Sequence, residues 1–190
     1  EFRRVLFRSD TDEDGDGDTD TDTDTVSLKI PNKEIVSIFR DSVVRYFTDT
    51  VSSDTIKKLL EALWEKDEIG SGEILSGLLW DTISYNDYHE DYYHAFLAGV
   101  FVGRGYEVES NKEKGLGRPD IFLKDRKNRR AIIIEAKKSD KESDLNKDCN
   151  IAIKQIIDEK YADGMYGYDQ ILCYGVAFFR KQAKVKLLTM

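Results

Sequence analysis

The chain has 190 residues, of which 40% are hydrophobic and 35% are charged, and its formal net charge is −8. This length and apolar content suit one compact domain with additional segments. No run of about 18 apolar residues is present, which argues against a membrane-spanning helix. Residues 1–9 lack the apolar stretch and cleavage site of a signal peptide, so a cytoplasmic protein without a membrane partner is expected.

The negative charge is concentrated near the start of the chain. Residues 10–24 contain nine acids and no base, residues 1–9 carry a net charge of +2, and residues 25–190 are therefore close to neutral at −1. This near-neutral charge does not exclude a nucleic-acid partner, but it provides no overall basic surface that would indicate one. Five basic residues do cluster, either in a solvated turn or as a nucleic-acid contact: Lys124, Arg126, Lys127, Arg129 and Arg130.

The cysteines and histidines limit the metal chemistry that the chain can support. Cys149 and Cys173 form no CxxC pair, which favours a reducing compartment and disfavours a zinc site. Only two histidines occur, His89 and His94. A metal site must therefore rest on carboxylates, which suits Mg²⁺ or Mn²⁺.

The first 84 residues divide into three predicted segments. Residues 1–9 share no pattern with the rest and are interpreted as a non-native or sequence-assembly leader, and residues 10–25 as a disordered acidic spacer. Asp10, Asp12 and Asp14 resemble the start of a calcium loop, but Thr21 stands where that loop needs a glutamate. Residues 26–84 are predicted to be mainly helical, with a strand at 26–32, a helix at 34–47, and two more helices capped by Asp54 and Ser71.

Residues 85–190 change to an α/β pattern. The expected order is a helix at 87–103, strands at 105–110, 118–124 and 130–137, a helix at 145–162, and strands at 171–179 and 183–188. This is an αβββαβ arrangement with a mixed central sheet and one added strand.

Three charged residues stand on the second and third of these strands. If the intervening turn is centred between Lys127 and Asn128, Asp120 lies opposite Glu135, with Cβ atoms about 5 Å apart. Glu135 and Lys137 share a strand face. Two carboxylates can hold a divalent cation, and a lysine can orient a water molecule or stabilise a phosphate transition state. A surface ladder of Glu–Lys and Asp–Lys pairs explains the same residues, and residue chemistry alone leaves both interpretations open.

Pro119-Asp120, followed after fifteen positions by Glu135-Ala136-Lys137, resembles the motif of the PD-(D/E)XK nuclease superfamily. Four further segments resemble, in the right order, the module of this superfamily found C-terminal to AAA-ATPase-like domains in bacterial and archaeal proteins. They are Glu90–Phe96, Ser110–Arg118, Gln155–Tyr161, and Tyr174–Phe178 with Lys181. Together the similarity covers about residues 85–186.

The resemblance implies a restriction-endonuclease-like fold and roles for individual residues. Asp120 and Glu135 would be metal ligands, Lys137 the catalytic lysine, and Glu90 an acid that supports the metal site. Gln155 and Tyr161 would flank the site. On an ideal helix their side chains point about 120° apart, so the two residues are expected to have different roles, and Tyr161 can equally be a core residue.

Two more residues keep several possible roles. His94 lies one helical turn after Glu90 and can meet it, or it is simply a satisfied buried histidine. Arg118 can bind phosphate or pair with Glu113 or Glu90.

The expected function is Mg²⁺- or Mn²⁺-dependent hydrolysis of phosphodiester bonds, in DNA ahead of RNA. The alternatives are a catalytically silent module that binds nucleic acid or a protein, and a purely structural α/β module. Residues 26–84 resemble the tail of an AAA-ATPase-like domain, but no phosphate-binding G-x-x-x-x-G-K-[ST] motif occurs. The chain is therefore expected to be a carboxy-terminal fragment, with the ATPase-like domain as a possible partner.

Overall fold

The computed structural model describes residues 52–82, 90–102, 105–110, 117–163 and 165–189, without the side chains of Thr82, Glu90 and Asp91. The predictions for the leader, the acidic spacer, the strand at 26–32 and the helix at 34–47 lie outside these ranges. No helix within them is long and apolar enough to cross a membrane.

Helices α2 (Ser53–Trp64) and α3 (Glu68–Thr82) begin earlier than the sequence predicted. Ser52 caps α2, because its Oγ accepts a hydrogen bond from the Asp54 N–H at 3.2 Å, so Asp54 is not the cap. Ser71 is buried inside α3 and does not cap it. Asp67 precedes the helix, and its Oδ1 accepts a hydrogen bond from the Gly70 N–H in the first turn of α3 at 2.9 Å. Serine and aspartate cap equally well, so the pattern alone does not select the residue that starts the helix.

Within the described residues, the sheet has five strands in the order β1 (Glu107–Glu109), β2 (Ile121–Asp125), β3 (Arg130–Lys138), β4 (Gln170–Phe179) and β5 (Gln182–Leu187). Only β3 and β4 are parallel, and a short 3-10 turn (Glu142–Asp144) and α5 (Leu145–Asp158) connect them. Together with α4 (Glu90–Phe101), the order α4-β1-β2-β3-α5-β4 confirms the predicted αβββαβ arrangement and its mixed sheet.

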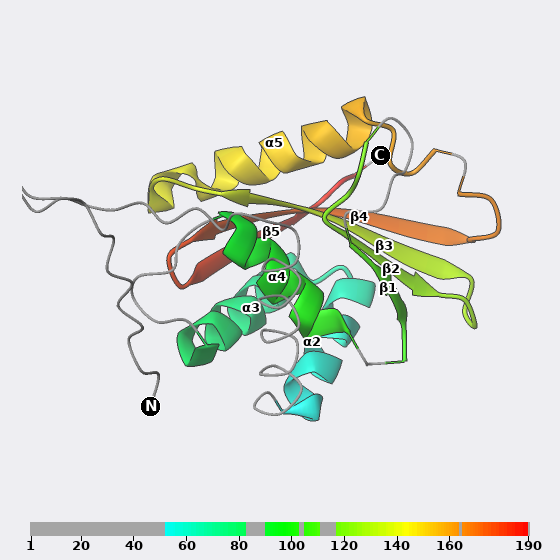
Figure 1. The fold of residues 1–190 in the computed structure, drawn as a ribbon, viewed down its shortest axis with the longest axis horizontal. Helices are drawn as coiled ribbons and strands as arrows, with labels where there is room; N and C mark the ends of the chain where they lie inside the picture. The colour runs from blue at the N-terminus through cyan, green and yellow to red at the C-terminus, as the bar shows by residue number, and fades with distance from the viewer. Residues whose placement is uncertain (1–51, 83–89, 103–104, 111–116, 164, 190) are drawn as a thin grey trace, which may run out of the picture. The chain divides into compact units, whose positions relative to one another are not determined.

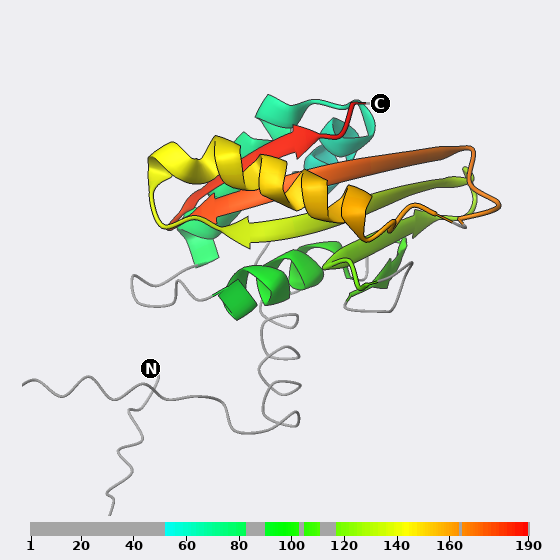
Figure 2. The same ribbon diagram turned by 90° about the horizontal axis from the view of Figure 1, so that it is seen from above.

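Helices cover both faces of this sheet. Figure 1 shows α5 over one face and α2, α3 and α4 over the other, and Figure 2 gives the same layers from above. Successive residues of β3 alternate between the two cores: Ile132 and Ile134 pack in the cluster with α2–α4, and Ile133 packs with Ile156 of α5. Burial on both faces explains why β3 reads as a continuous apolar run.

Helices α2 and α3 share the larger core with the strands. Leu63 and Leu79 belong to the same buried cluster as Tyr174 and Val176 of β4, and the Tyr174 hydroxyl donates a hydrogen bond to the Leu63 carbonyl. The predicted segment boundaries at 9, 25 and 84 stay a prediction.

Gly175 allows α5 to lie directly on β4. A Cβ atom at this position would lie 2.3 Å from the carbonyl oxygen of Cys149, closer than nonbonded atoms approach. Because Gly175 pairs with Glu135 in the parallel register, this close contact sets the height of α5 above the predicted site.

Candidate active site

Asp120 and Glu135 face each other across the β2–β3 hairpin. The pairs Ile121–Ile134 and Asp125–Arg130 centre the turn between Lys127 and Asn128, which confirms the predicted register. Asp120 lies immediately before β2, and its Oδ2 accepts a hydrogen bond from the Ala136 N–H at 2.8 Å. One of its oxygens is thereby fixed beside the strand that carries Glu135.

Glu135 is 2% exposed and Asp120 is 7% exposed. Burial, and secondly the negative charge of Asp120, raise the pKa of Glu135 to about 7. Its Oε1 accepts a hydrogen bond from Lys137 Nζ at 2.9 Å, whereas its buried Oε2 has no hydrogen-bond partner among the described residues. A buried carboxylate oxygen is costly without a partner, so this position is suited to a cation.

The donor set fits a magnesium-type ion rather than a fully protein-built metal centre. Within the described ranges, no group of three or more histidine, cysteine, aspartate and glutamate side chains is placed to hold a metal. Mg²⁺ commonly binds through one or two carboxylates and completes its shell with water and substrate phosphate oxygens. Asp120 and Glu135 would be those two carboxylates, since Glu135 Oε2 has no hydrogen-bond partner among the described residues.

His94 approaches Asp120 from α4. Its Nε2 lies 3.4 Å from Asp120 Oδ2, and the side chain is half-buried. Glu90 is the first residue of the same helix, but its side chain is outside the described part, so the predicted Glu90–His94 contact stays a prediction.

Gln155 and Tyr161 meet in space, contrary to the expectation from an ideal helix. Helix α5 ends at Asp158, and Lys160 takes a left-handed φ of 54°. The Tyr161 N–H bonds the Ile156 carbonyl and the Lys160 N–H bonds the Ile157 carbonyl, which is the Schellman pattern of chain reversal. The reversal brings the Tyr161 hydroxyl to 3.2 Å from Gln155 Nε2, which donates to it.

Tyr161 is buried beside the carboxylates. Burial raises its pKa, and the charges of Glu135 and Asp120 act in the same direction. Gly117 packs against it, because a Cβ there would lie 3.0 Å from Tyr161 Cε1. The sequence did not single out this role of Gly117, and its only signal was the glycine inside the G-L-G-R segment. Arg118 follows it in an exposed position next to the buried Pro119.

The basic cluster at the β2–β3 turn is largely neutralised by acidic neighbours. Lys124 pairs with Glu107 and Glu109, Arg126 with Glu107, Arg129 with Asp169, and Arg130 with Asp125. These pairs favour the interpretation as a solvated, ion-paired turn.

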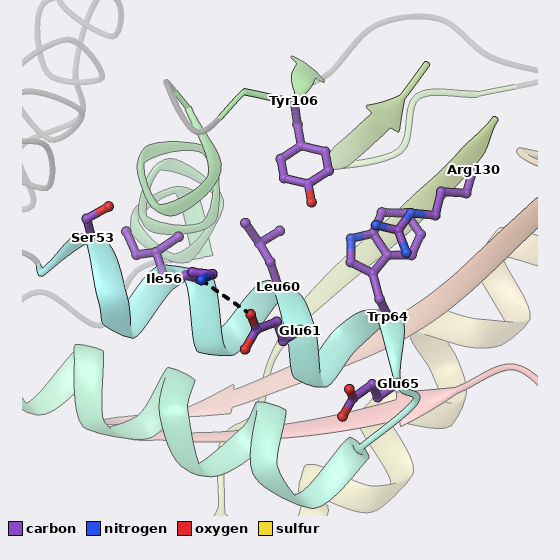
Figure 3. Close-up of a pocket in the computed structure, with 9 residues that line it drawn as sticks. Ser53, Ile56, Leu60, Glu61, Trp64, Glu65, Tyr106 and Arg130 are labelled. Carbon is purple, nitrogen blue, oxygen red and sulfur yellow. Dashed lines mark ion pairs between the residues drawn. The ribbon is translucent and has the colours of Figure 1, made fainter. Parts of the chain in front are cut away.

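A cavity of about 720 Å³ lies at the amino end of β3, next to Arg130 and on the α2 side of the sheet (Figure 3). None of the predicted site residues lines it. The Arg130 guanidinium covers the Trp64 ring there, with its carbon 4.1 Å from the ring centroid. The cavity is therefore separate from the carboxylate site.

A family model described as the PD-(D/E)XK nuclease superfamily matches residues 88–187. A search of curated proteins found no match. The matched region spans more than half of the chain and contains Asp120, Glu135 and Lys137 in the order of the motif. The chain therefore belongs to the PD-(D/E)XK nuclease superfamily.

Proposed function

We propose that this chain is a metal-dependent nuclease that hydrolyses phosphodiester bonds, in DNA ahead of RNA. The observation that carries the proposal is the state of Glu135. Its carboxyl group is buried, is repelled by Asp120, and leaves Oε2 without a partner among the described residues, while Lys137 occupies Oε1. A divalent cation is the partner that relieves both the burial and the repulsion.

In this proposal Asp120 and Glu135 hold Mg²⁺ or Mn²⁺, and Glu90 adds an acid from the start of α4. The ion, when bound, lowers the pKa of a water molecule and offsets charge on the phosphate. Lys137 Nζ, held on Glu135 Oε1, either orients the attacking water or stabilises the charge that develops on the phosphate.

The supporting residues surround this centre. The hydrogen-bonded pair of Gln155 and Tyr161 lies beside the carboxylates. His94 contacts Asp120 and holds its position. Arg118 is an exposed cation that binds the phosphate. Because residues 25–190 carry a net charge of only −1, their electrostatic attraction for the phosphates of DNA is small. We therefore propose that an ATPase-like partner domain delivers the substrate. The two buried, free cysteines suit a reducing compartment such as the cytoplasm.

Cleavage of circular and single-stranded DNA, with and without Mg²⁺ or Mn²⁺, tests this function. We expect Mg²⁺-dependent nicking that falls at least about 100-fold in Glu135→Gln and in Lys137→Ala, the scale seen when one group that stabilises a transition state is lost. The matched controls are Glu61→Gln and Lys127→Ala, which change exposed residues far from the site and should keep full activity.

Equal activity in the wild type and in Glu135→Gln would show that the nicking does not come from this site. DNA binding without cleavage under any metal condition would instead support the catalytically silent alternative. Thermal unfolding of each variant separates loss of chemistry from loss of fold.

A further inference from the structure

Trp80 exposes a large aromatic ring near the carboxyl end of α3. Its side chain is 61% exposed, although tryptophan is usually well buried. Lys181 Nζ lies 4.8 Å from the centroid of the ring and also donates a hydrogen bond to the Trp80 carbonyl at 3.3 Å. The ring is thus held next to a cation while much of its surface remains open to solvent.

Trp80 lies at the end of the sheet that carries the candidate active site. Lys137 pairs with Ala177 and Lys138 with Phe178, so the β4–β5 turn at Arg180–Lys181 extends just beyond the carboxyl end of β3. Figures 1 and 2 both place this turn beside the carboxyl end of α3. At about 3.3 Å per residue along β4, the turn is roughly 15–20 Å from Gly175, which pairs with Glu135. Glu135 is in phase with Ile133 on the α5 face of the sheet, whereas α3 covers the other face, so a bound strand that reaches both passes around the carboxyl end of β3.

Helix α4 connects the turn to the site. The Tyr93 hydroxyl donates a hydrogen bond to the Arg180 carbonyl at 2.8 Å, and the Tyr93 ring stacks on Phe178 with centroids 4.6 Å apart. The next residue, His94, contacts Asp120. The position of Trp80 and Lys181 relative to the carboxylates is therefore fixed by packed side chains.

We propose that Trp80 and Lys181 form a platform on which an unpaired base of single-stranded nucleic acid stacks, a few nucleotides from the cleaved phosphate. The inference rests on the proposed nuclease function and adds the substrate class. Stacking of a base on an aromatic ring contributes about 5- to 150-fold in affinity. A near-neutral domain that gains little from phosphate attraction needs such a contact.

The edge of the sheet next to Trp80 does not offer a site for an added peptide strand. The Ala183 N–H donates to Ser76 Oγ at 2.9 Å, and the Leu187 N–H donates to Glu68 Oε1 at 2.8 Å. Two of the outward N–H groups of β5 are therefore occupied by side chains of α3, and Gly72 lies against the Ala183 carbonyl. A stacked base needs none of these backbone groups, which favours nucleic acid over a strand-forming peptide.

Binding of a 5′-labelled oligothymidylate of about 12 nucleotides, measured by fluorescence anisotropy in EDTA, tests the platform without requiring hydrolysis. We expect Trp80→Ala to weaken binding about 5- to 150-fold. Tyr166→Ala is the matched control, because Tyr166 is 94% exposed and lies before β4 at the opposite end of the sheet. An oligouridylate of the same length separates RNA from DNA.

A second readout uses tryptophan emission. The chain has two tryptophans, so Trp64→Phe leaves Trp80 as the only reporter, and stacking of the oligonucleotide should quench it while a blunt duplex should not. Unchanged affinity in Trp80→Ala, an equal loss in Tyr166→Ala, or equal quenching by duplex overturns the platform. If one of these results is found while the chain still cleaves DNA, the platform is wrong and the nuclease proposal is unaffected. If the oligonucleotide stacks on Trp80 but no cleavage occurs, the nuclease proposal alone is contradicted.

Discussion

Glu135 links the stability of the protein to pH. Its pKa is about 7 in the folded protein against an ordinary value of 4.5, because it is buried beside Asp120. The folded state therefore binds the proton more tightly than the unfolded state does. The resulting stabilisation is fully present below about pH 4.5 and is lost as the pH rises through 7, which amounts to about 3 kcal/mol.

Replacing this carboxyl group with an amide should remove that pH dependence. We expect Glu135→Gln to raise the free energy of unfolding of the metal-free protein by up to about 3 kcal/mol at pH 8, and to change it little near pH 4.5. Urea denaturation at both pH values measures the difference. A variant that is equally destabilised at both would show that Glu135 is not a strained, buried acid.

Among the elements, α5 is positioned by two features, the glycine at 175 and the chain reversal at Lys160. The sequence contains a glycine at the first but no glycine that would predict the second. Gly175 stands in a strand where any side chain would meet the Cys149 carbonyl. The reversal at Lys160 uses a non-glycine residue at φ 54°, so no glycine marks the end of the helix. The sequence therefore predicted a helix to 162, and it also missed the contact between Gln155 and Tyr161 that the reversal creates.

The hairpin that carries Asp120 and Glu135 was predictable for a different reason. Its turn is short and polar, its strands are apolar, and one register alone places the two carboxylates directly opposite each other. The individual ion pairs of the basic turn were not predictable, because they depend on residues distant in sequence, such as Glu107 and Asp169. The same holds for Glu135 Oε2, whose lack of a hydrogen-bond partner among the described residues depends on the packing of the whole site.

Two glycine substitutions should have opposite effects on stability. Gly175→Ala should lower the free energy of unfolding by about 1–3 kcal/mol, because α5 must move away from β4. Gly77→Ala should raise it by about 0.5–1 kcal/mol, because Gly77 lies within α3 and an added Cβ would meet nothing within 4 Å. Thermal or urea unfolding of both variants checks the pair, and a neutral Gly175→Ala would contradict the close packing of α5.

For the whole molecule, the distribution of charge limits how nucleic acid can bind. The acidic residues 10–24 account for the negative total, and residues 25–190 are nearly neutral. Most cations at the β2–β3 turn are paired with acids, which leaves the phosphate contacts to a few residues at the other end of the sheet.

This balance predicts a weak dependence of binding on salt. With two or three phosphate contacts, the logarithm of the association constant for single-stranded DNA should fall with the logarithm of salt concentration at a slope of about −2 or shallower. Anisotropy titrations between about 50 and 200 mM salt measure it. A slope near −5 would reveal a basic surface that the described residues do not provide.

The site itself is tested most directly by the position of a bound ion. Crystals grown with Mn²⁺ should give an anomalous peak about 2.1 Å from Glu135 Oε2 and from a carboxylate oxygen of Asp120, with Lys137 alongside. The same crystals of Glu135→Gln should lack the peak. No peak between these carboxylates at saturating Mn²⁺, or a peak held only by other residues, would contradict a metal-dependent active site built on Asp120, Glu135 and Lys137.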